Sequence, residues 1–360
     1  MVHTNPVDAK RRRGRGAAGN ESGRFEALSV SAFDDGWESL GRLPAIKTTV
    51  TREFPKTIIT RNASPDVPFD RSINPYRGCE HGCVYCYARP SHAWHGLSAG
   101  LDFESRLFAK PDAARLLARE LARPGYRVAP IAMGTNTDPY QPIERRFAIT
   151  RSILEVLLAH RHPLTIVTKS AGILRDLDLL SEMAARNLVQ VGLSVTSLDH
   201  RLSRLMEPRA AAPKRRLEVV SQLTAAGVPS AVMVAPVIPA INDHQIDDIL
   251  KEARAAGARQ AHYILIRLPG EVAALFEQWL AEHFPDRRDH VLSLIRDMRG
   301  GQVNDPRFGK RMRGGGPYAH ILARRFALAA KKLGLDRPGA PLATDLFRPP
   351  ARDSRQLQLL

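Results

Sequence analysis

Cysteine is scarce in this chain of 360 residues: there are only three, and all of them lie between positions 79 and 86. An odd count argues against a framework of structural disulfides. The chain also lacks any run of about 18 apolar residues, which argues against a transmembrane helix. Its basic N-terminus is not followed by the apolar segment of a signal peptide. We therefore expect a protein of the reducing cytoplasm that has no membrane partner.

Acidic residues are also few, with 37 Asp and Glu against 53 Lys and Arg, so the formal net charge is +16. The excess is uneven: residues 1–25 hold six basic residues against two acidic ones, and residues 296–332 hold ten against two. Such a stretch is typical of a nucleic-acid-binding surface, and it is equally typical of the solvated surface of a basic protein. Residues 296–332 are thus a candidate contact for nucleic acid.

The three cysteines form a C-x3-C-x2-C motif made of Cys79, Cys83 and Cys86. Thiolates are the ligands that hold iron–sulfur clusters, and four of them would saturate a four-iron cluster. Three thiolates leave one iron with an open position, which is what allows a metal centre to bind and activate another molecule. The motif therefore predicts a [4Fe-4S] cluster on a single loop.

Two other interpretations of the motif stay open. A structural zinc site would need a fourth ligand, which a nearby histidine could supply, although the usual finger spacings are not met. The candidates for that ligand are His81, His92 and His95. A redox pair formed by Cys83 and Cys86 is possible, but it leaves the third cysteine without a role.

The residues around the motif, Asn74-Pro-Tyr-Arg-Gly-Cys-Glu-His-Gly-Cys-Val-Tyr-Cys-Tyr-Ala88, resemble the radical S-adenosylmethionine (radical SAM) superfamily. They are most similar to the branch that contains spore photoproduct lyase and proteins labelled DNA repair photolyases. The resemblance implies that a [4Fe-4S] cluster and SAM are the cofactors and that an electron donor such as flavodoxin or ferredoxin is a partner. It also implies reductive cleavage of SAM to a 5′-deoxyadenosyl radical, with the cofactor performing the difficult chemistry.

From about residue 66, short apolar runs rich in β-branched residues alternate with amphipathic stretches. This alternation predicts βαβ units and a parallel sheet. Strands are expected around residue 73 and at 128–133, 164–168, 189–194, 230–237 and 261–266. Because six strands are too few for a closed eight-stranded barrel, we predict an α/β fold with a partial (βα)6 barrel of TIM type, as the resemblance also implies. A doubly wound open sheet is the alternative.

The organisation along the chain follows from changes in composition. The first residues are basic and lack periodicity, strand-like runs precede the barrel, and helical patterns with a Gly/Arg-rich loop at 299–317 follow it. We expect a disordered tail (1–25), an N-terminal cap (26–65), the barrel (66–270), a helical C-terminal extension (271–335) and an irregular tail (336–360).

In barrels of parallel strands, ligands bind at the carboxyl ends of the strands. Asn136 and Asp138 follow the second expected strand, Lys169 follows the third, and Ser194 ends the fourth. The resemblance implies that these four residues contact SAM and that Tyr85 lies near its adenine. Each also has an ordinary structural interpretation as a turn former or an exposed residue. Arg216 is expected on the solvated face of its helix.

No cysteine is left outside the motif to return a hydrogen atom to a substrate, which puts a lyase reaction in doubt. A tyrosine could take that role, and the candidates are Tyr76, Tyr87, Tyr140, Tyr263 and Tyr318. Three functions remain open: a radical SAM enzyme acting on nucleic acid, one acting on a small molecule or a protein, and a non-catalytic zinc protein. In the first two, the Gly/Arg-rich loop would serve as a lid or as the contact to an anionic group.

Overall fold

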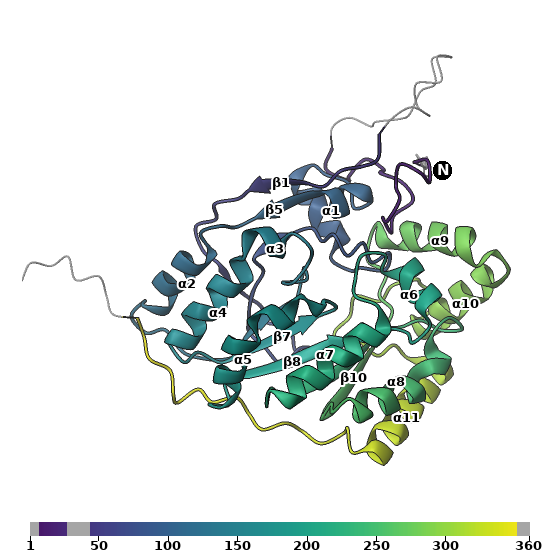
Figure 1. Ribbon diagram of the computed structural model, residues 1–360. Helices are drawn as coiled ribbons and strands as arrows, with labels where there is room; N and C mark the ends of the chain where they lie inside the picture. The colour runs from purple at the N-terminus through teal and green to yellow at the C-terminus, as the bar shows by residue number, and fades with distance from the viewer. Residues whose placement is uncertain (1–6, 27–43, 351–360) are drawn as a thin grey trace, which may run out of the picture.

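The computed structural model describes residues 7–26 and 44–350, and its main feature is a sheet of seven strands (Figure 1). Six of the strands are parallel and stand side by side in the order of the chain. They are β3 (Arg71–Ile73), β6 (Ile131–Met133), β7 (Leu164–Thr168), β8 (Val189–Ser194), β9 (Ser230–Val237) and β10 (Gln260–Leu265). A short seventh strand, β2 (Ile59–Arg61), pairs antiparallel with β3 at the edge.

The strand order separates the two folds that the sequence left open. A doubly wound sheet reverses direction at a switch point, so that its first strand lies in the middle. Here each strand pairs with the next one along the chain, from β3 through β10, as in a barrel that is wound in one sense only. The predicted six-stranded partial barrel is therefore confirmed.

Helices follow the strands and cover one face of the sheet, where Figure 1 shows α4, α5, α7 and α8 side by side. The strands beneath them are largely buried, and Val191 and Leu193 on one face of β8 are fully enclosed. Gly227, with φ of +75°, ends α7 in the left-handed conformation that glycine adopts most easily. The covering helices are α2 (Ala113–Leu121), α3 (Glu144–Phe147), α4 (Ile149–Ala159), α5 (Leu177–Ala184), α7 (Pro213–Ala225) and α8 (Ile246–Ala255).

The N-terminal region is built differently from what the sequence suggests. The described part of the expected disordered tail, residues 7–25, lies against the barrel, and Ala17 in it is buried. The expected cap also does not stand alone, since β2 belongs to the main sheet and β1 (Thr49–Arg52) pairs with a later strand. That strand, β5 (Arg106–Ala109), follows the short helix α1 (Leu101–Ser105) and also pairs with β4 (Tyr76–Arg77).

Helices complete the fold after the last strand, as expected. They are α9 (Val272–His283), α10 (Arg288–Met298) and α11 (Gly316–Leu333), and α11 lies beside α8 in Figure 1. The α9 and α10 helices pack with α6 (His200–Met206) around Val84 and Tyr85, so they form part of the support of the cysteine loop. Residues 336–350 are irregular, and the rest of the predicted tail lies outside the described residues.

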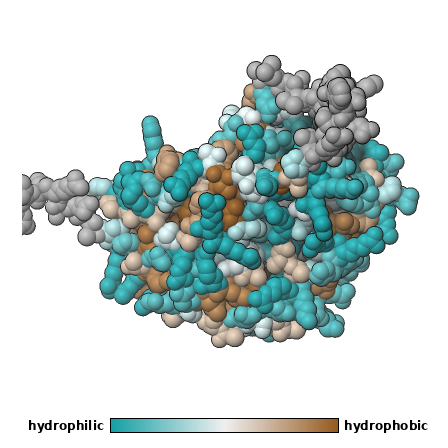
Figure 2. Space-filling model, turned by 45° about the horizontal axis from the view of Figure 1, so that its top comes forward, coloured by the Kyte–Doolittle hydropathy of each residue, from teal (hydrophilic) through white to brown (hydrophobic). Residues whose placement is uncertain are grey.

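The face of the molecule that Figure 2 shows is mainly polar. Hydrophilic side chains dominate the face shown in Figure 2, with smaller hydrophobic areas between them. This is the usual appearance of a protein surface that faces water. Among the described residues, no helix combines the length and the apolar character needed to cross a bilayer.

Candidate metal and cofactor site

The cysteine loop begins after β4 and is held by main-chain hydrogen bonds. The amide of Cys79 donates to the carbonyl of Phe103 at 2.9 Å, and that of Val84 donates to the carbonyl of Met206 at 3.1 Å. Gly82, between the first two cysteines, has φ of +68°, a conformation that favours glycine. These bonds and this turn fix the loop from two separate helices, α1 and α6.

All three thiols are free and sit in surroundings that disfavour the thiolate. Burial, followed by the nearby carboxylate of Asp138, raises the pKa of Cys79. Burial, with the carboxylate of Glu207, raises the pKa of Cys83 to about 12, and burial also raises the pKa of Cys86. Thiolates here therefore need a cationic partner, and metal binding deprotonates thiols in this way. The donor set of three soft sulfur atoms fits an iron–sulfur cluster.

A buried carboxylate, Glu207, links this loop to the barrel. Its oxygens accept hydrogen bonds from the hydroxyls of Tyr85 and Thr196 and from the guanidinium of Arg216. Burial opposes ionisation, but Arg216 and then Lys169 outweigh it and lower the pKa of Glu207 to about 2. The expectation that Arg216 is solvated was wrong: only 1% of its surface is exposed, because it pairs with this carboxylate and donates to the carbonyl of Ser194.

Lys169 lies where the sequence predicts, directly after β7. Its ammonium is 3.9 Å from Glu207 Oε1 and 5.9 Å from the centre of the Tyr85 ring, and its side chain is 16% exposed. The same charge lowers the pKa of both Cys83 and Cys86, against the effect of burial. The structure thus brings together a lysine, an aromatic ring and two of the thiols.

The carboxylate of Asp138 is already hydrogen-bonded to other groups of the protein, whereas contact with a ligand would need a free carboxylate oxygen. Its Oδ1 accepts the hydroxyl of Thr168 at 2.7 Å, and its Oδ2 accepts the amide of Lys169 at 2.8 Å. The imidazole of His81 lies 3.3 Å from the same carboxylate. Burial is outweighed by these partners, chiefly His81, and the pKa of Asp138 falls to about 2. The residue ties the cysteine loop to β7, and direct contact with SAM stays a prediction.

The other two predicted SAM contacts are placed at the same end of the sheet. The amide of Asn136 donates to Asn74 Oδ1 at 3.0 Å, which joins the loops after β6 and β3. Ser194 ends β8 and is buried, with its carbonyl bonded to Arg216. Their contacts with the protein are therefore defined, and their contact with a cofactor stays a prediction.

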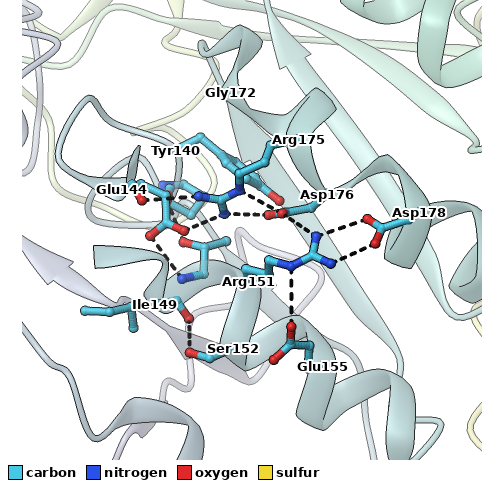
Figure 3. Close-up of polar contacts among 12 residues, drawn as sticks. Tyr140, Glu144, Ile149, Arg151, Ser152, Glu155, Gly172, Arg175, Asp176 and Asp178 are labelled. Carbon is cyan, nitrogen blue, oxygen red and sulfur yellow. Dashed lines mark hydrogen bonds and ion pairs between the residues drawn. The ribbon is translucent and has the colours of Figure 1, made fainter. Parts of the chain in front are cut away.

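A second charged network joins β4 to the helices after β6 and β7. Tyr76 in β4 donates its hydroxyl to Glu144. Glu144 accepts a further bond from Arg175 at 2.6 Å (Figure 3). Arg175 also pairs with the buried Asp176, and Arg151 donates to that same carboxylate at 3.0 Å. The strand that leads into the cysteines is thus linked to the helices after β6 and β7.

The Gly/Arg-rich loop between α10 and α11 reaches the cysteine loop. Arg299 is buried and donates to the carbonyls of Lys310 and Ile266, which fixes the base of the loop beside the end of β10. Arg267 donates to the sulfur of Met312 at 3.7 Å and lies 5.1 Å from the centre of the Tyr87 ring. Because Tyr87 follows Cys86 directly in the chain, the Gly/Arg-rich loop lies beside the cysteine loop. We call this part of the molecule, around Tyr87 and Arg267, the mouth of the site.

Among the candidate tyrosines, Tyr87 differs from two others in its surroundings. Its side chain is next to Cys86 and 45% of the residue is exposed, while its hydroxyl donates to the carbonyl of Thr135. The hydroxyl of Tyr76 is bonded to Glu144, and that of Tyr318 is bonded to Asp243. Tyr87 is therefore the tyrosine of these three that faces the mouth.

Residues 73–253, which include the cysteine motif and the whole of β6, β7, β8 and β9, match the family model described as Radical SAM superfamily. The chain belongs to the radical SAM superfamily. An uncharacterized protein of Mycobacterium tuberculosis is 37% identical over 284 residues, covering 78% of this chain and 79% of the relative. An uncharacterized protein of Methanocaldococcus jannaschii is 27% identical over 214 residues, covering 59% and 76%.

Solved structures of spore photoproduct lyase share the fold. Spore photoproduct lyase complexed with a dinucleoside spore photoproduct superimposes with a TM-score of 0.57 at 15% identity, covering 79% of each chain. The likeness shows a common fold and leaves the substrate of this radical SAM protein open.

Membership in the radical SAM superfamily implies a [4Fe-4S] cluster, SAM and a source of electrons, and the three cysteines have the spacing that goes with it. It also argues against the non-catalytic zinc protein. Two residues that build this site, Glu207 and Arg216, are not among the predicted cofactor contacts, because they look like ordinary charged surface residues until the fold buries them together.

Proposed function

We propose that this radical SAM enzyme holds a [4Fe-4S] cluster through Cys79, Cys83 and Cys86 and acts on nucleic acid. The observation that carries the first part is a single loop with three free thiols, of which Cys79 is buried and the other two are half-buried. The charge of Lys169 lowers the pKa of those other two thiols, Cys83 and Cys86. When bound, such a cluster supplies the electron that cleaves the sulfonium bond of SAM, with flavodoxin or ferredoxin as the proposed donor.

The surrounding residues would bind and orient SAM. Lys169 provides a cation for the carboxylate of SAM. The ammonium of Lys169 lies between Glu207 on one side and the Tyr85 ring on the other. Tyr85 offers an aromatic surface for the adenine. The proposed roles of Asn136, Asp138 and Ser194 are to contact the cofactor or to shape the backbone that does so.

Nucleic acid is the proposed substrate because of the loop at the mouth. Lys310 and Arg313 on this loop are exposed, and Met312 between them touches Arg267 beside the cysteine loop. A phosphate backbone on this loop would therefore place its bases next to the reacting centre. The fold shared with spore photoproduct lyase, seen complexed with a dinucleoside spore photoproduct, supports the same choice.

Anaerobic reconstitution with iron and sulfide, followed by reduction in the presence of SAM, tests the cofactor chemistry. We expect 5′-deoxyadenosine as a product from the full chain, and none from Cys83→Ala, because the cluster would lose one of its three ligands. The unfolding temperature of the apo-proteins serves as the control for folding. Turnover that persists in Cys83→Ala would overturn the ligand assignment.

The substrate class needs its own experiment. Deuterated single-stranded and duplex oligonucleotides are incubated with the reconstituted enzyme, and deuterium in 5′-deoxyadenosine is measured by mass spectrometry. Transfer of deuterium from an oligonucleotide supports nucleic acid as the substrate. Formation of 5′-deoxyadenosine without transfer from undamaged or ultraviolet-irradiated oligonucleotides leaves the cofactor chemistry intact and favours a small-molecule or protein substrate.

A further inference from the structure

Residues 15–17 of the N-terminal segment lie against the back of the cysteine loop. Gly16 is buried, and a Cβ atom at this position would overlap the carbonyl oxygen of Gly82, which lies between Cys79 and Cys83. Only a residue without a side chain allows so close an approach of two backbones. The segment is therefore fitted to the loop along its main chain.

The contact continues through a carboxylate that is wholly enclosed. Glu104 in α1 is fully buried and accepts hydrogen bonds from the amides of Gly16 and Ala17, each at 2.8 Å. Its third donor is the guanidinium of Arg89 at 2.6 Å. Burying a carboxylate is unfavourable unless its oxygens are satisfied, so the N-terminal segment supplies partners that Glu104 requires.

Arg89 carries this contact to the cysteine loop itself. It is also fully buried, and its Nε donates to the carbonyl of Cys83 at 2.9 Å. Its Nη1 donates to the carbonyls of Ala99 and Gly100 at 3.0 and 2.9 Å. A rigid connection therefore runs from the two N-terminal amides through Glu104 and Arg89 to the backbone of Cys83.

A parallel connection starts from Arg15. Its guanidinium donates to the carbonyl of Glu104 at 2.5 Å and to Thr48 Oγ1 at 2.9 Å. The Thr48 hydroxyl in turn donates to Glu80 at 2.6 Å, and Glu80 follows Cys79 in the chain. Two independent sets of hydrogen bonds thus link the segment to residues at both of the first two cysteines.

We propose that residues 15–17 are a positioning element of the cluster site, which fixes the backbone of the cysteine loop and covers Gly82 from solvent. The inference rests on the proposed ligation of a cluster by the three cysteines. It assigns a role to a basic stretch whose composition suggests a free arm for nucleic acid. Hydrogen-bonded partners of metal-binding residues commonly control how tightly a metal is held.

Three variants of the full chain test this role. Gly16→Ala separates the two backbones, and Glu104→Gln keeps the volume of the side chain but removes its charge. Arg13→Ala is the matched control, because Arg13 is basic, lies in the same segment and is exposed. After anaerobic reconstitution, the measurements are iron and sulfide per chain, the half-life of the cluster absorbance in the presence of a chelator, and the electron paramagnetic resonance spectrum of the reduced cluster.

We expect Gly16→Ala and Glu104→Gln to lose the cluster faster by on the order of 10-fold or more and to show altered spectra, with Arg13→Ala unchanged. The unfolding temperature of each apo-protein is measured beside them. Equal half-lives and spectra in all variants would overturn the inference. So would losses that merely follow a lower unfolding temperature, and Glu104→Gln decides this if Gly16→Ala does not fold. A wild-type chain that binds no iron would contradict the proposed function instead.

Discussion

Single charged residues, rather than apolar ones, distinguish the site at the end of this barrel. Glu104, Glu207, Arg89 and Arg216 are each almost or completely buried, and each has a partner of opposite charge. Such pairs contribute little net stability when they form, because desolvation offsets the attraction. Removing one partner is costly, however, since the other charge is then left buried and alone. These residues therefore make the site intolerant of substitution without being catalytic.

Arg216 provides a direct test of this reasoning. In Arg216→Met, Glu207 loses its guanidinium partner inside the protein, and we expect the free energy of unfolding to fall by about 3–5 kcal/mol. The neighbouring Arg215 is the matched control, because its side chain is 48% exposed and it pairs with Glu218 at the surface. Arg215→Met should cost less than about 1 kcal/mol. Urea unfolding of the apo-proteins measures both, and similar losses would show that the buried pair is not critical.

Among the elements, those that follow hydrophobic periodicity could be predicted and those set by tertiary contacts could not. The six strands and α7 follow apolar runs and a first-turn proline, Pro213, that are visible in the sequence. The amphipathic stretch at 144–159 forms two helices, α3 and α4, rather than one, because Ala148 adopts φ of +50° between them. The α6 helix was missed, although Asp199 caps its first turn and could have indicated it.

The residues of the site also divide into those that a sequence pattern predicts and those that only tertiary contacts determine. The cysteines, Lys169 and Ser194 could be nominated from their spacing and from their places after strands. The packing of residues 15–17 onto Gly82 could not, because it depends on main-chain amides, whose partners leave no trace in composition. The low complexity of that basic segment instead favours disorder, and burial by a distant helix overrides it.

The Gly/Arg-rich loop is held at its ends by α10 and α11 and in its middle by one contact with another loop. Gly309 and Arg311 bind the carboxylate of Asp66 from the loop between β2 and β3, at 2.7 and 2.6 Å. Phe308 is left 58% exposed with the guanidinium of Arg311 4.7 Å from its ring centre. An exposed aromatic ring beside arginines is suited to stacking with an unpaired base.

Phe308→Ala should weaken binding of single-stranded DNA by roughly 10-fold, since the stacking of one base on an aromatic ring contributes about 1–3 kcal/mol. Phe54→Ala is the control, because Phe54 is 65% exposed and lies outside the loop. Fluorescence anisotropy with a labelled oligonucleotide measures both variants. Equal affinities for the two variants and the wild type would remove Phe308 from the contact.

Over the whole molecule, the excess of positive charge is divided between residues that the fold uses and residues that it leaves free for a partner. Of the ten basic residues in 296–332, Arg299 is buried, while Arg307, Arg311 and Arg325 pair with Asp305, Asp66 and Asp247. Net charge therefore overstates the surface available to a polyanion. The exposed charges include one pair at the mouth, Lys310 and Arg313, and one pair in the last turn of α11, Lys331 and Lys332.

The dependence of DNA affinity on salt separates these two groups. The slope of log K against log salt is negative, and each phosphate that a lysine or arginine neutralises makes it steeper by about 0.7 to 0.9. If nucleic acid binds at the mouth, replacing both Lys310 and Arg313 by Gln should make that slope shallower by about 1.5. Replacing Lys331 and Lys332 by Gln removes the same charge from the last turn of α11 and should leave the slope unchanged. An equal reduction in both double variants would mean that the protein attracts DNA through its overall charge alone, and the proposed path of the substrate into the barrel would then lose its support.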